Sequence, residues 1–361
     1  MKHKAFNVLR LVAILILTSA SVGHPEKENN SSLVKPEFSI IDQSLHIEFP
    51  QDHGAHHPFR FEWWYLTANL KDKIGTDHGV QFTIFRTSLE PKMKRVKGWN
   101  NAEIWMAHVA STDKNTHIVE EKFARGGISQ AGVFSSPFRA WIDNWELSGQ
   151  DFSKMEVSVQ GKKLKYYLRL EAEGPIILHG ENGLSLKSES GQASAYYSQP
   201  FFKASGWIEK NGAQFEVTGS AWFDHEWSSQ FLDESKAGWD WFSLNLSTGE
   251  RIMLFKIRDH NGSQYYSGTL AKNDGSVENL DPNGITLQPI GAGTNEIKYP
   301  TEWKVKISDL NVDVIVKALN SNSFMDTRIP YWEGPIKLSG SHEGMGYLEM
   351  TGYESESLLP N

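Results

Sequence analysis

Hydrophobic and polar side chains alternate with a period of two along most patterned segments of the chain. Apolar residues at every second position place one face of an extended strand in a core. Turn signals such as Asn211-Gly212, Asp274-Gly275 and Asn283-Gly284 separate these segments. After the N-terminal region, no segment of about 12 residues or more shows a helical stripe. The pattern predicts an antiparallel sandwich or barrel. The clearest strands are predicted at 80–86, 164–172, 215–223, 251–258 and 312–319.

Two aromatic segments resemble each other and indicate an internal repeat. Residues 63–70, WWYLTANL, precede one predicted strand, and residues 239–246, WDWFSLNL, precede another. The likeness is found when Trp64 is aligned with Trp241. Two copies of one β unit would also explain the length, since a single hydrophobic core stops growing at roughly 250–300 residues. The alternative is that two aromatic strands resemble each other by chance.

The first 23 residues have the pattern of a secretory signal peptide. Lys2, Lys4 and Arg10 precede an apolar run at 11–17, and small residues follow it. The run is short for a transmembrane span, although an uncleaved membrane anchor is the alternative. We therefore expect an exported mature chain, periplasmic or secreted, without a transmembrane segment. The predicted organisation is a signal peptide at 1–23, a polar linker at 24–37, and two domains at 38–230 and 231–361.

Composition excludes several classes of function. The 361 residues include no cysteine, which excludes disulfides, thiol nucleophiles, cysteine–zinc sites and iron–sulfur clusters. The net charge is −8 and there is no basic block, so nucleic acid is not expected as a partner. The sequence motifs of serine hydrolases, zincins, nicotinamide enzymes and P-loop enzymes are missing. We expect no cofactor, no metal and a monomer.

The densest group of polar and aromatic residues lies at 222–227, WFDHEW, and at 238–241, GWDW. A carboxyl group among indole rings loses solvation and can stay protonated as a general acid, while an imidazole can take the base role. Indole faces can stabilise a cation between them. In an alternating strand Asp224 and Glu226 share one face, and His225 shares the other face with Trp227. The alternative is a buried hydrogen-bonded network that fixes a junction between β units.

A histidine-rich segment at 53–57, HGAHH, precedes the first aromatic strand. Three histidines in five residues could bind a metal, but we interpret the segment as a solvated loop. Glu62 lies among aromatic residues and is a candidate cavity carboxylate, or else it forms a salt bridge with Arg60 or Arg86. His108 lies on an apolar strand, where a buried core histidine is the usual outcome and a ligand contact is the alternative.

Short motifs occur in a fixed order along the chain. They are Phe61-Glu62-Trp63-Trp64-Tyr65, Phe85-Arg86-Thr87, Ala107-His108, Asn182-Gly183-Leu184-Ser185-x-Lys187, Asp224-His225-Glu226-Trp227, Gly238-Trp239-Asp240-Trp241-Phe242 and Tyr331-Trp332-Glu333-Gly334. This ordered set resembles the AttH-like family, which includes bacterial carotenoid 1,2-hydratases (hydroxyneurosporene synthases) and fungal kievitone hydratase. The resemblance covers roughly residues 38–355.

The resemblance implies an all-β fold of two lipocalin-like, calycin-type antiparallel β-barrel domains. For some members it implies the addition of water across an isoprenoid double bond without a cofactor, whereas other members are labelled only as predicted secreted hydrolases. His225, Trp227 and Asp240 match the polar-aromatic site of the family and carry over as candidates.

We therefore predict an exported lipocalin-like protein that acts on an apolar molecule, an isoprenoid or a lipid, by hydrating a C=C bond. In this hypothesis Asp240, kept protonated between the rings of Trp239 and Trp241, protonates the alkene, and Trp227 stabilises the cation. His225, tuned by Asp224 or Glu226, deprotonates water. A non-catalytic carrier of an apolar ligand and a secreted hydrolase are the alternatives. The residues expected to line the ligand site are Trp63, Trp64, Trp227, Trp239, Trp241, Glu62 and His108.

Overall fold

The computed structural model describes residues 37–91, 96–230, 236–292 and 299–353. Within these ranges the protein is almost entirely β-strand, and its only helices are four short 3-10 helices. The all-β prediction is confirmed. The predicted signal peptide and most of the predicted linker lie outside the described residues. Among the helices of the described ranges, none is long and apolar enough to cross a membrane. The 3-10 helices are η1 (Gln51–His53), η2 (Gly98–Asn100), η3 (Pro282–Gly284) and η4 (Ser308–Leu310).

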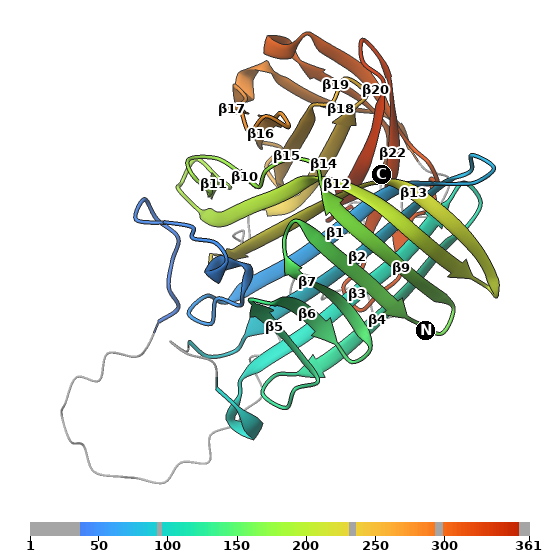
Figure 1. Cartoon of the computed structure of the whole chain (residues 1–361). Helices are drawn as coiled ribbons and strands as arrows, with labels where there is room; N and C mark the ends of the chain where they lie inside the picture. The colour runs from blue at the N-terminus through green and yellow to red at the C-terminus, as the bar shows by residue number, and fades with distance from the viewer. Residues whose placement is uncertain (1–36, 92–95, 231–235, 293–298, 354–361) are drawn as a thin grey trace, which may run out of the picture.

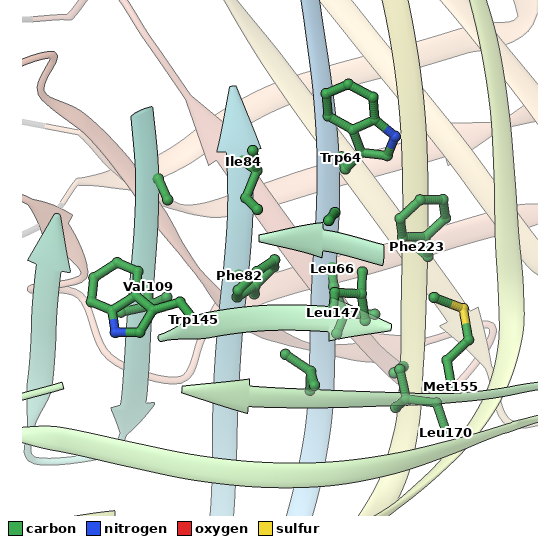
Figure 2. Close-up of a cluster of buried hydrophobic side chains, with 14 of the residues drawn as sticks. Trp64, Leu66, Phe82, Ile84, Val109, Trp145, Leu147, Met155, Leu170 and Phe223 are labelled. Carbon is green, nitrogen blue, oxygen red and sulfur yellow. The ribbon is translucent and has the colours of Figure 1, made fainter. Parts of the chain in front are cut away.

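The first sheet forms a nearly closed antiparallel barrel (Figure 1). Its strands are β1 (Phe61–Asp72), β2 (Asp77–Ser88), β3 (Glu103–Asp113), β4 (His117–Arg125), β5 (Ala131–Ser135), β6 (Phe138–Ile142), β7 (Trp145–Asp151), β8 (Lys154–Gln160), β9 (Leu164–Ala172), β10 (Ile177–Leu178), β11 (Leu184–Leu186), β12 (Ala193–Lys210) and β13 (Ala213–Ser228). The strand order is β4-β3-β2-β1-β13-β12-β9-β8-β7-β6-β5, and β10 and β11 pair with β12. Side chains fill the barrel interior, where Trp64, Phe82 and Leu147 are fully buried (Figure 2).

The second sheet contains the remaining strands and curves into a half-barrel. Its strands are β14 (Lys236–Leu246), β15 (Arg251–Asp259), β16 (Gln264–Ala271), β17 (Val277–Asn279), β18 (Ile285–Ala292), β19 (Pro300–Ile307), β20 (Val312–Ala318), β21 (Phe324–Met325), β22 (Tyr331–Gly340) and β23 (Gly344–Met350). The order is β17-β16-β15-β14-β23-β22-β20-β19-β18, and β21 pairs with β22. This architecture agrees with the two lipocalin-like barrels that the sequence predicted. The chain changes sheet between Ser228 and Lys236, whereas the domain boundary at residue 230 stays a prediction.

The alternating segments predicted as strands at 80–86, 164–172, 215–223 and 251–258 lie within strands of the structure, and β20 covers the predicted segment 312–319 except for its last residue. The turn signal Asn283-Gly284 lies in η3, which separates β17 from β18. The side chain of Asp281 accepts a hydrogen bond from the backbone N–H of Asn283 and caps this short helix.

The internal repeat corresponds to the hairpins β1–β2 and β14–β15, but its predicted alignment is shifted by one residue. Trp64 points into the barrel core, whereas Trp241 contacts Tyr65 between the two sheets. Because neighbouring strand residues face opposite sides, Trp64 and Trp241 are not equivalent. Aligning Tyr65 with Trp241 restores the match, since it places Leu66 on Phe242 and both of these point into their own cores.

The outer face of β1 and β2 packs against β22 and β23 of the second sheet (Figure 1). Asn69 donates a hydrogen bond from Nδ2 to the carbonyl of Gly346 at 2.9 Å. The two sheets also approach closely at Gly79, where an added Cβ would lie 2.5 Å from the hydroxyl of Tyr347 and 2.7 Å from Pro335. A glycine is therefore required for the two sheets to meet at this distance.

Candidate functional site

Side chains along β13 point alternately to the two faces of the sheet, so the polar-aromatic segment at 222–227 is divided between the barrel interior and the side that faces the second sheet. His225 and Trp227 point into the barrel, where they join the core around Tyr197. Asp224 and Glu226 lie on the opposite face, toward the second sheet. The predicted division of faces is confirmed, and it produces two separate polar clusters.

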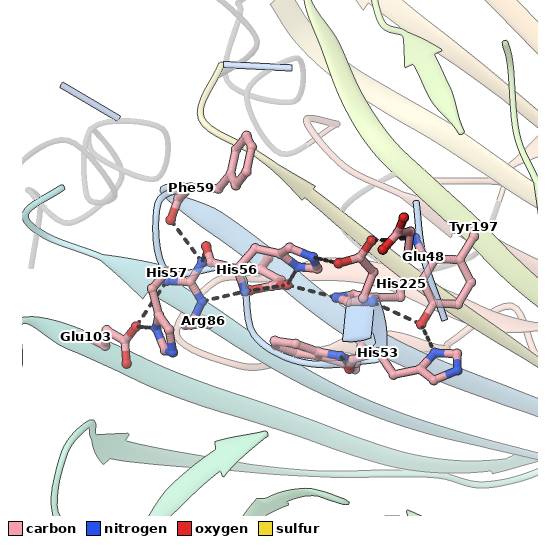
Figure 3. A network of polar contacts seen from close by, with 12 residues as sticks. Glu48, His53, His56, His57, Phe59, Arg86, Glu103, Tyr197 and His225 are labelled. Carbon is pink, nitrogen blue, oxygen red and sulfur yellow. Dashed lines mark hydrogen bonds and ion pairs between the residues drawn. The ribbon is translucent and has the colours of Figure 1, made fainter. Parts of the chain in front are cut away.

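The first cluster, which we call the barrel network, is centred on Glu62. Figure 3 shows His56, Arg86 and His225 of this network close together. Its Oε2 accepts a hydrogen bond from Arg86 Nε at 2.9 Å, and its Oε1 lies 2.6 Å from His56 Nδ1 and 2.9 Å from His225 Nε2. Arg86 also contacts Glu103 Oε1 through Nη1 at 3.2 Å. The side chains of Glu62, Arg86 and His225 are fully buried. Of the alternatives considered for Glu62, its ion pair with Arg86 is therefore present.

The histidine-rich segment belongs to this network. Tyr197 Oη lies 3.1 Å from His225 Nδ1 and 2.7 Å from His53 Nδ1. The ring of His56 stacks on Trp227 with centroids 3.9 Å apart. The interpretation as a solvated loop was wrong, because the barrel end offers these rings aromatic and carboxylate partners that a single-sequence view does not place nearby.

The proton states of the barrel network follow from burial and charge. Burial alone raises the pKa of Glu62, but the charges of His56 and Arg86 and the histidine hydrogen bonds outweigh it and hold that pKa well below its usual range. Burial lowers the pKa of His225 to about 4. For His56 the lowering by burial is outweighed by Glu62 and Asp52, and its pKa is raised. Both ring nitrogens of His56 and of His225 already have partners, so neither is free to act on a substrate as the network stands.

The second cluster, which we call the inter-sheet cluster, lies between the outer faces of the two sheets. It comprises Tyr65 and His108 from the first sheet with Tyr331, Glu333 and Glu349 from the second. Tyr65 donates its hydroxyl to Glu333 Oε1, and Tyr331 Oη lies 3.0 Å from His108 Nδ1. Glu349 is the cross-strand neighbour of Glu333.

Two atoms of this cluster are buried without a hydrogen-bond partner among the residues that the structure describes: Oε2 of Glu333 and Nε2 of His108. The nearest carboxylate to that nitrogen is Glu121, at 3.9 Å. A buried unsatisfied polar atom is costly and calls for a reason. Phe85, which is partly exposed, packs edge-on to His108 with ring centroids 5.3 Å apart, and Trp241 packs on Tyr65. The base group therefore lies against the partly exposed ring of Phe85, whereas the acid group is bonded to Tyr65, which packs on the buried ring of Trp241.

Burial separates the proton states of these groups. It raises the pKa of Glu333 well above its usual range, and the neighbouring Glu349 adds to that rise. Burial also raises the pKa of Glu349 to about 7 and lowers the pKa of His108 to about 3. At neutral pH the cluster therefore contains a protonated carboxyl group and a neutral imidazole, the pairing that acid–base catalysis uses.

The environment expected for Asp240 is wrong. Asp240 points into the core of the second sheet and pairs with Lys256 at 3.1 Å. Trp239 and Trp241 face the opposite side of β14, so they do not enclose it. The carboxyl group beside these indoles is Glu349, which accepts a hydrogen bond from Trp239 Nε1 at 2.8 Å.

The other predicted residues are spread over the two clusters, and their roles stay predictions. Asp224 is buried at the edge of the inter-sheet face, and burial raises its pKa to about 7. Glu226 pairs with Lys187 at 2.7 Å. Trp63 packs against the aromatic residues of the inter-sheet face, whereas Trp64 stacks within the barrel network.

Sequence reasoning missed Glu333 and Glu349 as site residues. Glu333 stands in the motif at 331–334, YWEG, where an acidic residue interrupts an apolar strand. That interruption was the available signal. Its partner Tyr65 was not visible, because it lies on a strand of the other sheet.

Comparison with known proteins places these clusters in context. The profile of the AttH-like family matches residues 41–353. The crystal structure of a candidate AttH protein from Nitrosomonas europaea is similar at 31% identity and a TM-score of 0.79, covering 88% of this chain and 99% of that one. The crystal structure of kievitone hydratase from Nectria haematococca has a similar fold at 14% identity and a TM-score of 0.65, covering 88% and 97%. Comparison with curated protein sequences finds no match.

Proposed function

The chain belongs to the AttH-like family, and from this premise and the inter-sheet geometry we propose that it is a hydratase that adds water to a C=C bond of an apolar molecule. The observation that carries the proposal is the pair Glu333 and His108. These are buried groups of opposite proton state, each with one atom that has no hydrogen-bond partner among the described residues. The similar fold of a protein named kievitone hydratase supports the reaction class.

One assignment of protons satisfies the contacts of the inter-sheet cluster. His108 donates from Nδ1 to the oxygen of Tyr331, and Tyr331 and Tyr65 donate to Glu333. Nε2 of His108 is then a free acceptor. The acid proton of Glu333 sits on Oε2 and is a free donor. The cluster thus presents one acid and one base to the same interface.

Hydration follows from this assignment with atoms and protons balanced. Glu333 gives its proton to one alkene carbon, and the neighbouring carbon becomes a cation that the rings of Tyr65 and Phe85 stabilise. The oxygen of a water molecule attacks the cation, and its proton passes to Nε2 of His108. The imidazolium then gives its Nδ1 proton to Tyr331, whose hydroxyl proton returns to Glu333. Glu333 and His108 then carry their starting charges, and proton exchange with water moves the His108 proton from Nε2 back to Nδ1 and the Glu333 proton back to Oε2 before the next cycle.

The surroundings of the inter-sheet cluster support an apolar substrate, such as an isoprenoid or a lipid. The partly exposed rings that adjoin the cluster are those of Phe85, Trp63 and Trp239, and Trp239 is 37% exposed. Such rings bind apolar molecules without offering them charge. We also propose export of the chain, on the pattern of residues 1–23, and fractionation of expressing cells for the mature chain tests it.

The experiment that tests the proposed function is turnover in ¹⁸O-labelled water. The purified chain is incubated with squalene, as a generic isoprenoid alkene, and with an apolar extract of the native host, and products are read by mass spectrometry. We expect an intact skeleton that gains one labelled water. Glu333→Gln and His108→Gln should each lower the rate by about 100-fold or more, since positioned acids and bases contribute 10²–10⁴-fold.

The matched control is His260→Gln, which changes a histidine in an exposed turn and should keep full turnover. Two results would count against the proposal. Labelled fragments would mean hydrolysis, and an apolar molecule that co-purifies with all variants without turnover would mean a carrier. If Glu333→Gln and His108→Gln both fold and keep full turnover, the assignment of these two residues as acid and base is wrong.

A further inference from the structure

Three ligand-type atoms converge in the barrel network, which shares no residue with the inter-sheet cluster. They are Nδ1 of His56, Oε1 of Glu62 and Nε2 of His225, and all lie within 4.8 Å of one another. The atoms come from the loop before β1, from β1 itself and from β13, so three separate elements supply them. Ligands from separate elements, each held by an outer hydrogen bond, form an ordered metal site more readily than neighbouring histidines on one loop.

The second polar atom of each of these three side chains also has a hydrogen-bond partner. Asp52 Oδ1 lies 3.1 Å from His56 Nε2, and Tyr197 Oη lies 3.1 Å from His225 Nδ1. The remaining oxygen of Glu62 accepts a hydrogen bond from Arg86 Nε at 2.9 Å. A metal-binding histidine characteristically donates its second N–H to a carboxylate or another oxygen, which fixes the ring and its tautomer. The barrel network already contains such an outer shell for all three candidate ligands.

We propose that His56, Glu62 and His225 bind one divalent transition-metal ion of the Zn²⁺ type. Two imidazoles and one carboxylate suit Zn²⁺ or Co²⁺ rather than Mg²⁺ or Ca²⁺, which prefer all-oxygen sites. The ion takes the place of the two N–H protons that now bridge the histidines to Oε1 of Glu62. Three protein ligands leave a fourth position for water, and the side chain of His56 is 16% exposed, so that position faces the rim.

The fit requires a small expansion of the three ligands. Zn²⁺ bonds of about 2.0–2.1 Å in a tetrahedron separate the ligand atoms by about 3.3 Å. Oε1 of Glu62 is now 2.6 Å from Nδ1 of His56 and 2.9 Å from Nε2 of His225, so these two pairs must open by about 0.7 and 0.4 Å. His56 lies on the loop between η1 and β1, outside any strand, and can supply that movement. Asp52 and Glu103 add negative charge that offsets the positive charge of Arg86.

The test is metal binding to the metal-free protein, which needs no substrate. Chelator-treated protein is titrated with Zn²⁺ by calorimetry and with Co²⁺ by visible absorption. We expect one equivalent to bind, d–d bands of four- or five-coordinate Co²⁺, and a melting temperature that rises with Zn²⁺ concentration, because only the folded chain holds the three ligands together. His56→Gln and His225→Gln should weaken binding by at least about 100-fold and abolish the rise.

The control variant is His57→Gln, which removes the neighbouring histidine of the same loop. His57 contacts Glu103 and is not one of the three ligands. Equal loss of binding in His57→Gln and His56→Gln would mean loose chelation by the loop and would overturn the proposal. Absence of binding at 1:1 stoichiometry, or unchanged binding in His56→Gln, would overturn it as well. If His225→Gln fails to fold, His56→Gln decides the outcome, because His56 is partly exposed and lies in a loop, where a substitution is less disruptive to folding.

Discussion

Tyr65 on β1 donates its hydroxyl to the buried carboxyl group of Glu333 on β22, which lies 268 positions further along the chain. This bond joins the two sheets at the point where their outer faces meet. It also fixes the orientation of the one carboxyl group in the described inter-sheet cluster that has a free buried oxygen. One hydrogen bond therefore both holds the two sheets together and positions the proposed acid.

Removing this hydroxyl should affect both stability and proton affinity. Tyr65→Phe leaves the ring in place but removes a hydrogen bond that opposes the rise in the pKa of Glu333. We expect a loss of about 2 kcal/mol in the free energy of unfolding, the cost of one unsatisfied buried partner. If Tyr65 positions the acid, the alkaline limb of the pH–rate profile should also move to higher pH. Urea unfolding and a pH profile test these effects, and a stability loss with an unshifted profile would mean a purely structural role.

Glu349 should make the fold sensitive to pH near neutrality. Its pKa in the folded state is about 7, against an ordinary value of 4.5, so the folded state holds this proton more tightly than the unfolded chain does. Its contribution to stability is therefore largest at low pH and is lost as pH rises from about 4.5 through 7. Buried neutral histidines act in the opposite direction over part of this range, as His108 does.

A difference measurement isolates the contribution of Glu349. The melting temperature of Glu349→Gln should rise relative to that of the unchanged chain as pH increases from 5 to 8, because glutamine cannot ionise. Differential scanning calorimetry at matched pH values gives this difference. A difference that does not vary with pH would show that Glu349 titrates as an ordinary exposed carboxyl group.

The sequence was sufficient for the strands and their faces because alternation is a local property. Residues 164–172 are a strand with the predicted bounds, and His225 and Trp227 share a face as predicted. The site depends on pairing between distant strands, which alternation does not encode. Asp240 follows Trp239 in the chain, yet the carboxyl group beside that indole is Glu349 from β23.

The histidine-rich segment shows the same limit. Residues 53–57, HGAHH, combine histidines with two small residues, a composition that is typical of a surface loop. Their burial depends on the barrel end, where Tyr197 and Trp227 lie on strands β12 and β13. No local pattern indicates that a loop will meet such partners.

Gly79 should be intolerant of any side chain. An alanine Cβ there would lie 2.5 Å from Tyr347 Oη and 2.7 Å from Pro335, so the sheets must separate or the side chains must shift. We expect Gly79→Ala to cost about 1–3 kcal/mol, the range for overpacking a close contact. Thermal unfolding measures the loss. The matched control is Gly284→Ala, whose Cβ would meet its nearest atom, Ser308 Cβ, at an ordinary 3.7 Å. Equal losses in both variants would place the effect in glycine flexibility rather than in sheet packing.

Arg86 should be the most costly single charge to remove. It is fully buried and bonds both Glu62 and Glu103, so Arg86→Ala leaves two carboxylates without their guanidinium partner. Breaking a buried ion pair in this way costs about 3–5 kcal/mol, more than the packing lost with the side chain. Arg86→Lys keeps the charge but not the forked geometry, so it should recover only part of the loss. Urea unfolding of both variants, with Arg169→Ala as the exposed control, ranks their free energies of unfolding. If Arg86→Ala were no less stable than Arg169→Ala, Glu62 would have to be neutral in the folded chain, which would contradict the charge assignment of the whole barrel network.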